Sequence, residues 1–262
     1  MTPEFAFEKR DQMLRDGYCV VPDILTLEFV QELIEETDYL NDTMEHHPDT
    51  KYQGTHLGIK YENNRLYRRL VEWSPARAAL EAMGFGDFQD NGTLLVLTKE
   101  PYAPALYWHQ DWMRWNDPLS CTPWPQIMFV SYYLQDTCVE NGCLKVIPGT
   151  HLKRIPLHDQ MVTAHEQGAR FIEEDHPVMF SNHPDQVDLP SKTGAMVLAD
   201  ARVLHAAYRN QTNNRRDLLL LWHSRPETVP NYWDSEIPQV VAQRDSNAEY
   251  NGTRVPSDYL VT

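Results

Sequence analysis

From residue 92 onward the chain is a series of short apolar segments separated by turn residues. These segments are rich in β-branched and aromatic side chains, which favour strands, and they cover residues 93–98, 107–112, 126–134, 143–147, 194–198, 203–207 and 217–224. Turn signals such as Asn141-Gly142 and Pro148-Gly149 lie between them, and a long polar loop is expected over roughly 151–186. Many short strands at this spacing predict a cupin-like, double-sheet barrel of the jelly-roll type.

The first 90 residues have helical periodicity instead. Helices are predicted over 4–16, 27–40 (with Thr26 as the N-cap) and 65–83, where Ser74-Pro75 separates two helices. No Pro/Gly/Ser linker or repeat divides the chain. We therefore expect one mainly β domain with flanking helices over residues 1–262. Its helical part (1–90) packs on a jelly-roll core (91–225), and a C-terminal extension (226–262) follows.

Charge and cysteine content exclude several classes of protein. The 38 acidic and 23 basic residues give a net charge of −15, so a nucleic-acid or anionic-membrane partner, which needs basic patches, is not expected. We see no signal peptide and no apolar run of about 18 residues, and we expect a cytoplasmic protein. The four cysteines have no regular spacing and are expected to be free thiols. The sequence does not indicate an oligomeric state.

The segment around His109-Gln110-Asp111 contains two candidate metal ligands. Alternate side chains of a strand point to the same face, so His109 and Asp111 can reach one point. With a second histidine they would form the 2-His-1-carboxylate triad that holds non-haem iron. The same His-x-Asp pattern occurs at His47-Pro48-Asp49 and His183-Pro184-Asp185. There the central proline, which cannot donate to a strand ladder, favours solvated loops.

The third ligand has three candidates, His151, His205 and His223. His205 ends a short apolar segment, and Arg216 follows eleven residues later at the start of another. A buried arginine needs an anion, and its guanidinium suits one carboxylate bidentately. We therefore expect Arg216 to bind one carboxylate of an α-keto diacid whose other end chelates the metal, although a structural salt bridge is an equal alternative. Arg215 should point to the opposite face.

Several motifs in a fixed order resemble the phytanoyl-CoA dioxygenase family of Fe(II)/2-oxoglutarate oxygenases. They are Asp16-Gly17-Tyr18, Trp108-His109-Gln110-Asp111, Asn141-Gly142-Cys143-Leu144, Ile147-Pro148-Gly149-Thr150-His151, and His205 followed by Asn210 and Arg216. The resemblance covers nearly the whole chain. It implies a double-stranded β-helix in which His109, Asp111 and His205 bind Fe(II) and Arg216 binds 2-oxoglutarate. It also implies that His151 closes a structural turn.

The resemblance further implies a reaction in which 2-oxoglutarate and O2 are co-substrates, an unactivated C–H bond is hydroxylated, and succinate and CO2 are released. Desaturation, epimerisation, epoxidation or ring formation at the same site are alternatives, and a cupin-like binding protein is the non-enzyme alternative. Ala206-Ala207 stand where many relatives carry Gly-Ser, so a hydroxyl contact to 2-oxoglutarate is missing. Because Asp111 is retained, halogenation is not expected.

The substrate residues are less clear from the sequence. We expect a small metabolite or natural-product intermediate. Its candidate contacts are Trp112, Arg114 and Trp115 in the loop after the ligands, and Phe129, Ser131 and Tyr133 on one face of the next strand. Trp112, Trp115 and Trp124 could equally pack that loop onto the barrel. A group of N-terminal cations could contact an acidic substrate, but solvation is the favoured interpretation; the group is His46, His47, His56, Lys60 and Arg65.

Overall fold

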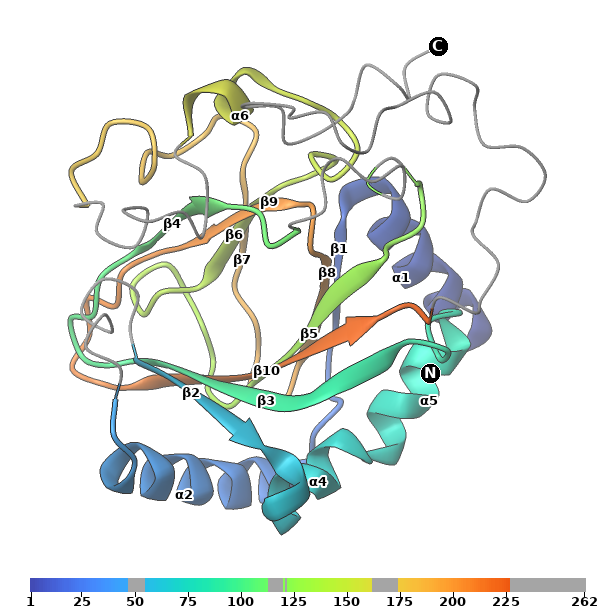
Figure 1. The fold of residues 1–262 in the computed structure, drawn as a ribbon, viewed down its shortest axis with the longest axis vertical. Coiled ribbons are helices and arrows are strands. Elements are labelled where there is room, and N and C mark those ends of the chain that lie inside the picture. Colours follow the sequence, from blue (N-terminus) through green and yellow to red (C-terminus); the bar gives the residue numbers. More distant parts are fainter. Residues whose placement is uncertain (47–54, 113–119, 121, 162–173, 227–262) are drawn as a thin grey trace.

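Two antiparallel sheets that face each other form the centre of the molecule (Figure 1). The structure is a computed structural model that describes residues 1–46, 55–112, 120, 122–161 and 174–226. The larger sheet has the order β1 (Tyr18–Val21), β8 (Met196–Asp200), β5 (Ile127–Tyr133), β10 (Arg216–Ser224), β3 (Gln89–Lys99) and β2 (Thr55–Lys60). The smaller sheet has the order β4 (Leu106–His109), β9 (Leu204–Ala207), β6 (Leu144–Ile147) and β7 (Val187–Leu189).

The predicted jelly roll is thus confirmed, but as an open pair of sheets. Within the described ranges no strand pairing joins the two sheets, so the barrel does not close. Successive strands alternate between the sheets: β8 lies in the larger, β9 in the smaller and β10 in the larger again. Side chains from late strands therefore face each other across the space between the sheets.

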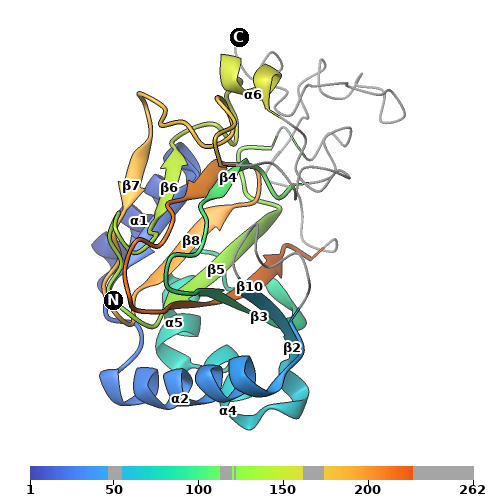
Figure 2. The same ribbon diagram turned by 90° about the vertical axis from the view of Figure 1, so that its left-hand side faces the viewer.

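Helices cover the outer face of the larger sheet, as Figure 2 shows for α2 (Leu27–Thr43), α4 (Arg65–Val71) and α5 (Ser74–Ala82). Successive side chains of β10 point to opposite faces of the sheet, and each face packs in a different cluster. Leu219 and Leu221 join the core with the helices, while Leu218 and Leu220 point between the sheets. The remaining helical elements are α1 (Pro3–Asp16), the 3-10 turn η1 (Tyr61–Asn63) and α6 (Pro156–Gln160).

The expected helix boundaries are set by local capping. The Thr26 hydroxyl accepts a hydrogen bond from the Phe29 amide at 3.2 Å, as predicted for an N-cap. Helix α1 ends at Gly17, whose φ of +83° is the left-handed conformation that glycine adopts without strain. In the described part of the chain, no helix combines the length and the apolar character that crossing a bilayer requires.

Two predictions about local structure were wrong. The strand expected to run to Trp112 ends at His109, because the amides of Asp111 and Trp112 both donate to the Ala201 carbonyl, at 2.8 and 2.9 Å. The expected long loop over 151–186 contains the short helix α6, which begins with Pro156. Proline suits the first turn of a helix, a signal that the polar composition of this segment obscured.

Candidate active site

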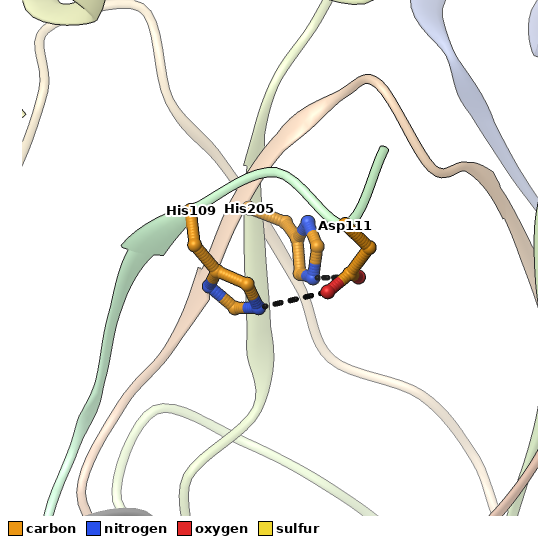
Figure 3. A group of neighbouring side chains, drawn as sticks. All are labelled: His109, Asp111 and His205. Carbon is orange, nitrogen blue, oxygen red and sulfur yellow. Dashed lines mark ion pairs between the residues drawn. The ribbon is translucent and has the colours of Figure 1, made fainter. Parts of the chain in front are cut away.

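Two histidines and one aspartate meet on the inner side of the smaller sheet. His109 of β4 and His205 of β9 are register partners, and their ring centroids lie 4.1 Å apart. The Asp111 carboxylate lies beside the two rings, with Oδ1 3.6 Å from His109 Nε2 and Oδ2 3.1 Å from His205 Nε2 (Figure 3). The three possible ligand atoms lie within 4.8 Å of one another. The predicted convergence of these three residues is therefore present.

The backbone fixes the orientation and tautomer of both imidazoles. His109 Nδ1 lies 2.8 Å from the Tyr107 carbonyl oxygen, and His205 Nδ1 lies 3.1 Å from that of Val203. A carbonyl can only accept, so each Nδ1 must carry the proton and Nε2 is the nitrogen left to bind a metal. This arrangement of the outer ring nitrogen is typical of metal-binding histidines.

The electrostatic environment of His205 also suits a cation. Burial by itself would lower the pKa of His205, but the neighbouring Asp111 carboxylate raises that pKa above its usual value. Asp111 therefore favours positive charge at this point, whether a proton or a metal ion. A metal that binds here has to displace the proton on Nε2.

The turn at residues 200–203 holds the strand end that carries Asp111. Besides the bonds from Asp111 and Trp112 to the Ala201 carbonyl, the Gln110 side-chain amide donates to the Arg202 carbonyl. The Gln110 side chain thus contacts the same turn. The backbone of this turn therefore positions the carboxylate relative to His205, which lies two residues after the turn.

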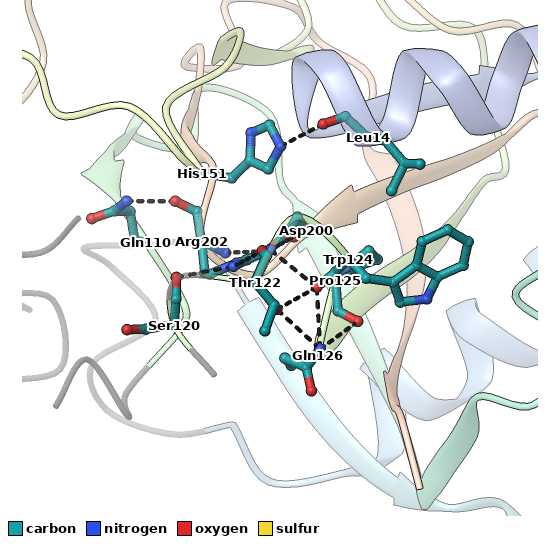
Figure 4. A network of polar contacts seen from close by, with 10 residues as sticks. All are labelled: Leu14, Gln110, Ser120, Thr122, Trp124, Pro125, Gln126, His151, Asp200 and Arg202. Atoms are coloured by element: carbon teal, nitrogen blue, oxygen red, sulfur yellow. Dashed lines mark hydrogen bonds and ion pairs between the residues drawn. The ribbon is translucent and has the colours of Figure 1, made fainter. Parts of the chain in front are cut away.

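The Arg202 side chain in turn ties this turn to the loop after the ligands (Figure 4). Its Nη2 is 2.6 Å from Asp200 Oδ2, and its Nη1 donates to the carbonyls of Ser120 and Thr122 at 3.0 and 2.7 Å. Burial alone would raise the pKa of Asp200, but the Arg202 guanidinium lowers it below the usual range. Sequence reasoning missed this network, although an aspartate two residues before an arginine was its signal.

A cavity of about 280 Å³ lies between the sheets and includes the triad in its wall. This volume is near the lower end of the range for small-molecule sites, about 300–1,000 Å³. Phe129, Ser131 and Tyr133 line it, while Met128, Val130 and Tyr132 face the helices. The phenyl ring of Phe129 lies 5.2 Å, centroid to centroid, from the imidazole of His205. The face of this strand that was expected to meet the substrate therefore faces the cavity.

Arg216 lines the same cavity and is only 4% exposed. Its Nη2 donates to the Gly142 carbonyl at 3.0 Å, its Nε has no partner, and no carboxylate of the described chain forms an ion pair with it. The neighbouring Arg215 points the other way and pairs with Asp38 and Glu100 at 2.8 and 3.1 Å. The two neighbouring arginines thus point to opposite faces, as predicted.

The other candidate histidines lie away from the triad. His151 Nε2 is 3.0 Å from the Leu14 carbonyl, which ties the turn after β6 to helix α1. His223 is buried near the far end of β10 and is absent from the cavity wall. His183 has Asp185, which is largely exposed, at 3.9 Å. His47 and Asp49 lie outside the described residues.

Of the candidate substrate residues in the loop, Arg114 and Trp115 lie outside the described residues. Trp112 is buried and is not part of the cavity wall. Trp124 packs on Phe85 with ring centroids 5.2 Å apart, which is the packing role weighed for it.

Two polar residues that were not expected in the cavity wall also line it. His56, for which substrate contact was the less favoured alternative, lies on β2 opposite Leu97. Lys99, the last residue of β3, also lines the cavity. The alternation Leu95, Leu97, Lys99 along β3 was the signal for it.

The model of the Phytanoyl-CoA dioxygenase (PhyH) family matches residues 13–218. The chain belongs to this family. Among curated relatives, the "Probable alpha-ketoglutarate-dependent hypophosphite dioxygenase" of Stutzerimonas stutzeri is 26% identical over 152 residues, which is 53% of this chain and 48% of that protein. The "Phytanoyl-CoA dioxygenase domain-containing protein 1 homolog" of Dictyostelium discoideum is 32% identical over 85 residues, 32% of this chain and 30% of that protein. The matches to this PhyH chain thus cover about half or less of the length of these two relatives.

Among solved structures, the epimerase SnoN in complex with Fe3+, alpha ketoglutarate and nogalamycin RO has the same fold as this PhyH chain. The TM-score is 0.64 at 22% identity, and the match covers 87% of this chain and 89% of SnoN. At this identity the likeness concerns the fold alone.

Proposed function

We propose that this PhyH-family chain is a non-haem Fe(II)- and 2-oxoglutarate-dependent dioxygenase. The observation that carries the proposal is one small cavity with the His109/Asp111/His205 triad and, in its wall, a buried arginine that forms an ion pair with no carboxylate of the described residues. The names of the hypophosphite dioxygenase relative and of the SnoN complex support the co-substrate.

The donor set fits Fe(II). Two neutral imidazoles and one carboxylate leave three of six positions open, which suits a metal that must also bind a chelating co-substrate and O2. When bound, Fe(II) supplies the redox and O2 chemistry that side chains lack. We propose His109, Asp111 and His205 as its ligands and Arg216 as the residue that binds the distal carboxylate of 2-oxoglutarate.

The protein residues contribute orientation and shielding. The backbone carbonyls of Tyr107 and Val203 keep the Nε2 atoms directed at the metal position. Phe129 packs on His205, and Leu220 and Trp222 continue this wall of the cavity with apolar side chains that exclude water. We propose that these three residues face the reacting carbon of a small-molecule substrate.

The proposed reaction converts 2-oxoglutarate, O2 and a substrate C–H bond into succinate, CO2 and a hydroxylated product. We propose a small metabolite or natural-product intermediate as the substrate. Desaturation, epimerisation, epoxidation or ring formation would use the same residues, because the outcome depends on where the substrate radical lies. We further propose that the chain acts in the cytoplasm. The three described cysteines, Cys19, Cys138 and Cys143, are free thiols, which agrees with a reducing compartment.

The test is Fe(II)-dependent succinate release from 2-oxoglutarate across a panel of small molecules, with the product mass measured for each hit. His109→Ala should abolish release. His183→Ala is the matched control, because it alters the same His-x-Asp pattern outside the cavity and should leave release unchanged. Absence of both succinate release and calorimetric 2-oxoglutarate binding in the wild-type protein would refute the proposal.

A further inference from the structure

One end of the cavity wall is aromatic, and it lies far from the arginine. Trp222 of β10 lines the cavity and is half-buried, and Arg216 lies six residues earlier on the same strand. A strand rises about 3.3 Å per residue, so the two Cα atoms are about 20 Å apart. Trp222 pairs in register with Phe129, whose ring lies 5.2 Å from the His205 imidazole, centroid to centroid. The triad therefore belongs to the aromatic end of the cavity.

The neighbour of Trp222 on β5 fixes the orientation of the indole. The rings of Phe129 and Trp222 meet edge to face, with centroids 5.9 Å apart and an interplanar angle of 90°. This is one of the favourable geometries for an aromatic pair. Phe129 is itself buried against His205. A row of three rings thus runs from a metal ligand to the half-buried indole, which is oriented before any ligand binds.

On its other side, the pairing of β10 with β3 is interrupted at Trp222. The register of the two strands shifts between Leu221 and His223. Over this interval β10 has one residue, Trp222, whereas β3 has three, residues 91–93. Bulges of this kind occur beside active sites, where they change the direction of a side chain. The cavity wall includes Leu95 of β3 but none of residues 91–93, which leaves room for a ligand beside the indole.

Local polar contacts stabilise this bulge. The Gly92 amide donates to Asp90 Oδ1 at 2.8 Å, and the Thr93 amide donates to Asn91 Oδ1 at 3.1 Å. Gly92 has a φ of +77°, in the left-handed region that glycine adopts without strain. A Cβ atom there would meet no other atom within 4 Å, so the backbone conformation, and not crowding, favours glycine. The interruption beside Trp222 is therefore encoded in the sequence of β3.

The cationic side chains of the described wall lie away from the aromatic end. Lys99 and Arg216 are register partners at the start of β10. The cavity-facing residues of β10 between Arg216 and Trp222 are Leu218 and Leu220, which are apolar. An anionic substrate group beside Trp222 would lose water without gaining a cationic side chain of the described wall, which is unfavourable. The aromatic end thus suits an uncharged group.

We propose that the substrate carries an uncharged planar ring that packs on the indole of Trp222 and presents a carbon attached to that ring to the metal position. The inference rests on the proposed function and deepens it by naming the substrate class. A rigid indole that is half-buried in the free protein gains contact area from such a ring at little cost in side-chain entropy. The hypophosphite in the name of the Stutzerimonas stutzeri relative is a small anion that would not use this surface.

The test is calorimetric titration of the full chain, loaded with Fe(II) and 2-oxoglutarate under anaerobic conditions. Indole is the uncharged planar probe, and hexan-1-ol is an open-chain probe of comparable hydrophobicity. Indole-2-carboxylate and hypophosphite are the anionic probes. The wild-type protein should bind indole about 3- to 10-fold more tightly than hexan-1-ol, the range for one aromatic contact. Trp222→Ala should remove this preference, and Trp222→Phe should keep most of it.

Trp124→Ala is the matched control. Trp124 is also half-buried and also packs on a phenylalanine, Phe85, at 5.2 Å between centroids, but it is absent from the cavity wall. This variant should keep the preference for indole. The 2-oxoglutarate affinity of the same preparations shows whether each variant is folded, because the co-substrate carboxylate is expected at the other end of the cavity.

The outcomes separate this inference from the proposed function. The inference alone is overturned if the wild-type protein does not bind indole at millimolar concentration, binds hexan-1-ol as tightly, or binds either anion more tightly. A preference for indole that survives Trp222→Ala would overturn it as well. A wild-type protein that binds no 2-oxoglutarate would overturn the proposed function, and the inference with it.

Discussion

Arg202 and Arg216 are both buried, yet their surroundings differ completely. Arg202 is fully buried and donates to both Asp200 oxygens and to backbone carbonyls of the loop at 120–124. Among the described residues, Arg216 has one carbonyl acceptor and its Nε has no hydrogen-bond partner. The first arginine is satisfied by its own chain, whereas we propose that the second binds an anion in the cavity. The number of internal acceptors thus distinguishes the two guanidinium groups.

The largest expected effect is the loss of the structural arginine. Arg202→Leu leaves Asp200 buried without a counter-charge, and removing one partner of a buried ion pair typically costs about 3–5 kcal/mol. Urea denaturation should show this loss in the free energy of unfolding. The double variant with Asp200→Asn should recover part of it. A loss below about 1 kcal/mol would mean that the two arginines do not differ in this way.

Arg216→Met should instead weaken binding. We expect the 2-oxoglutarate binding free energy to fall by about 2–5 kcal/mol, the usual cost of truncating one partner of a buried charge pair at an interface. The free energy of unfolding without ligand should not fall, because the variant removes an uncompensated buried charge. Calorimetry and urea denaturation of the same preparation check both statements. An Arg216→Met variant that loses stability but keeps its 2-oxoglutarate affinity would show that Arg216 has a structural role.

Ligand-dependent stability should also distinguish the two arginines. At a free 2-oxoglutarate concentration 100 times the dissociation constant, the wild-type protein should gain about 2.7 kcal/mol of stability. Arg216→Met should gain far less at that concentration, and Arg202→Leu, if it folds, should still gain. Thermal denaturation with and without the diacid measures these differences. Equal gains in wild type and Arg216→Met would show that the diacid binds without Arg216.

The smallest effect is expected for Arg215, the neighbour that pairs with Asp38 and Glu100 on the partly exposed outer face. Exposed ion pairs contribute about 0–1 kcal/mol, so Arg215→Met should change stability by no more than that. Its 2-oxoglutarate affinity should equal that of the wild type in the same calorimetric assay. An affinity loss comparable to that of Arg216→Met would contradict the assignment of the two faces.

The sequence predicted those features that depend on local spacing. The His109-x-Asp111 pair, the Thr26 cap and the alternation along β5 each follow from the period of one element. The extent of the strand after His109 was not predictable, because it ends through a contact with Ala201 far along the chain. The strand that became β3 was predicted to end at Thr98. Lys99 is the next residue, so its place in the cavity wall was missed.

Contacts between residues of different sheets were also not predictable from the sequence. The sequence placed Arg216 on a return strand after His205, but β9 and β10 lie in opposite sheets and face each other across the cavity. That arrangement depends on how late strands alternate between sheets, which no local pattern encodes. The polar residues around His56 left its segment undecided between loop and short strand, because strand β2 is completed only by pairing with β3.

The bonds from His109 and His205 to the carbonyls two residues before them have a further consequence. Each imidazole takes its direction from the main chain of its own strand, and the main chain is the same whatever side chains surround it. Side chains at neighbouring positions can therefore change without redirecting either ring. A substitution in the cavity wall would alter what the cavity accepts and leave the direction of both Nε2 atoms to the strands themselves.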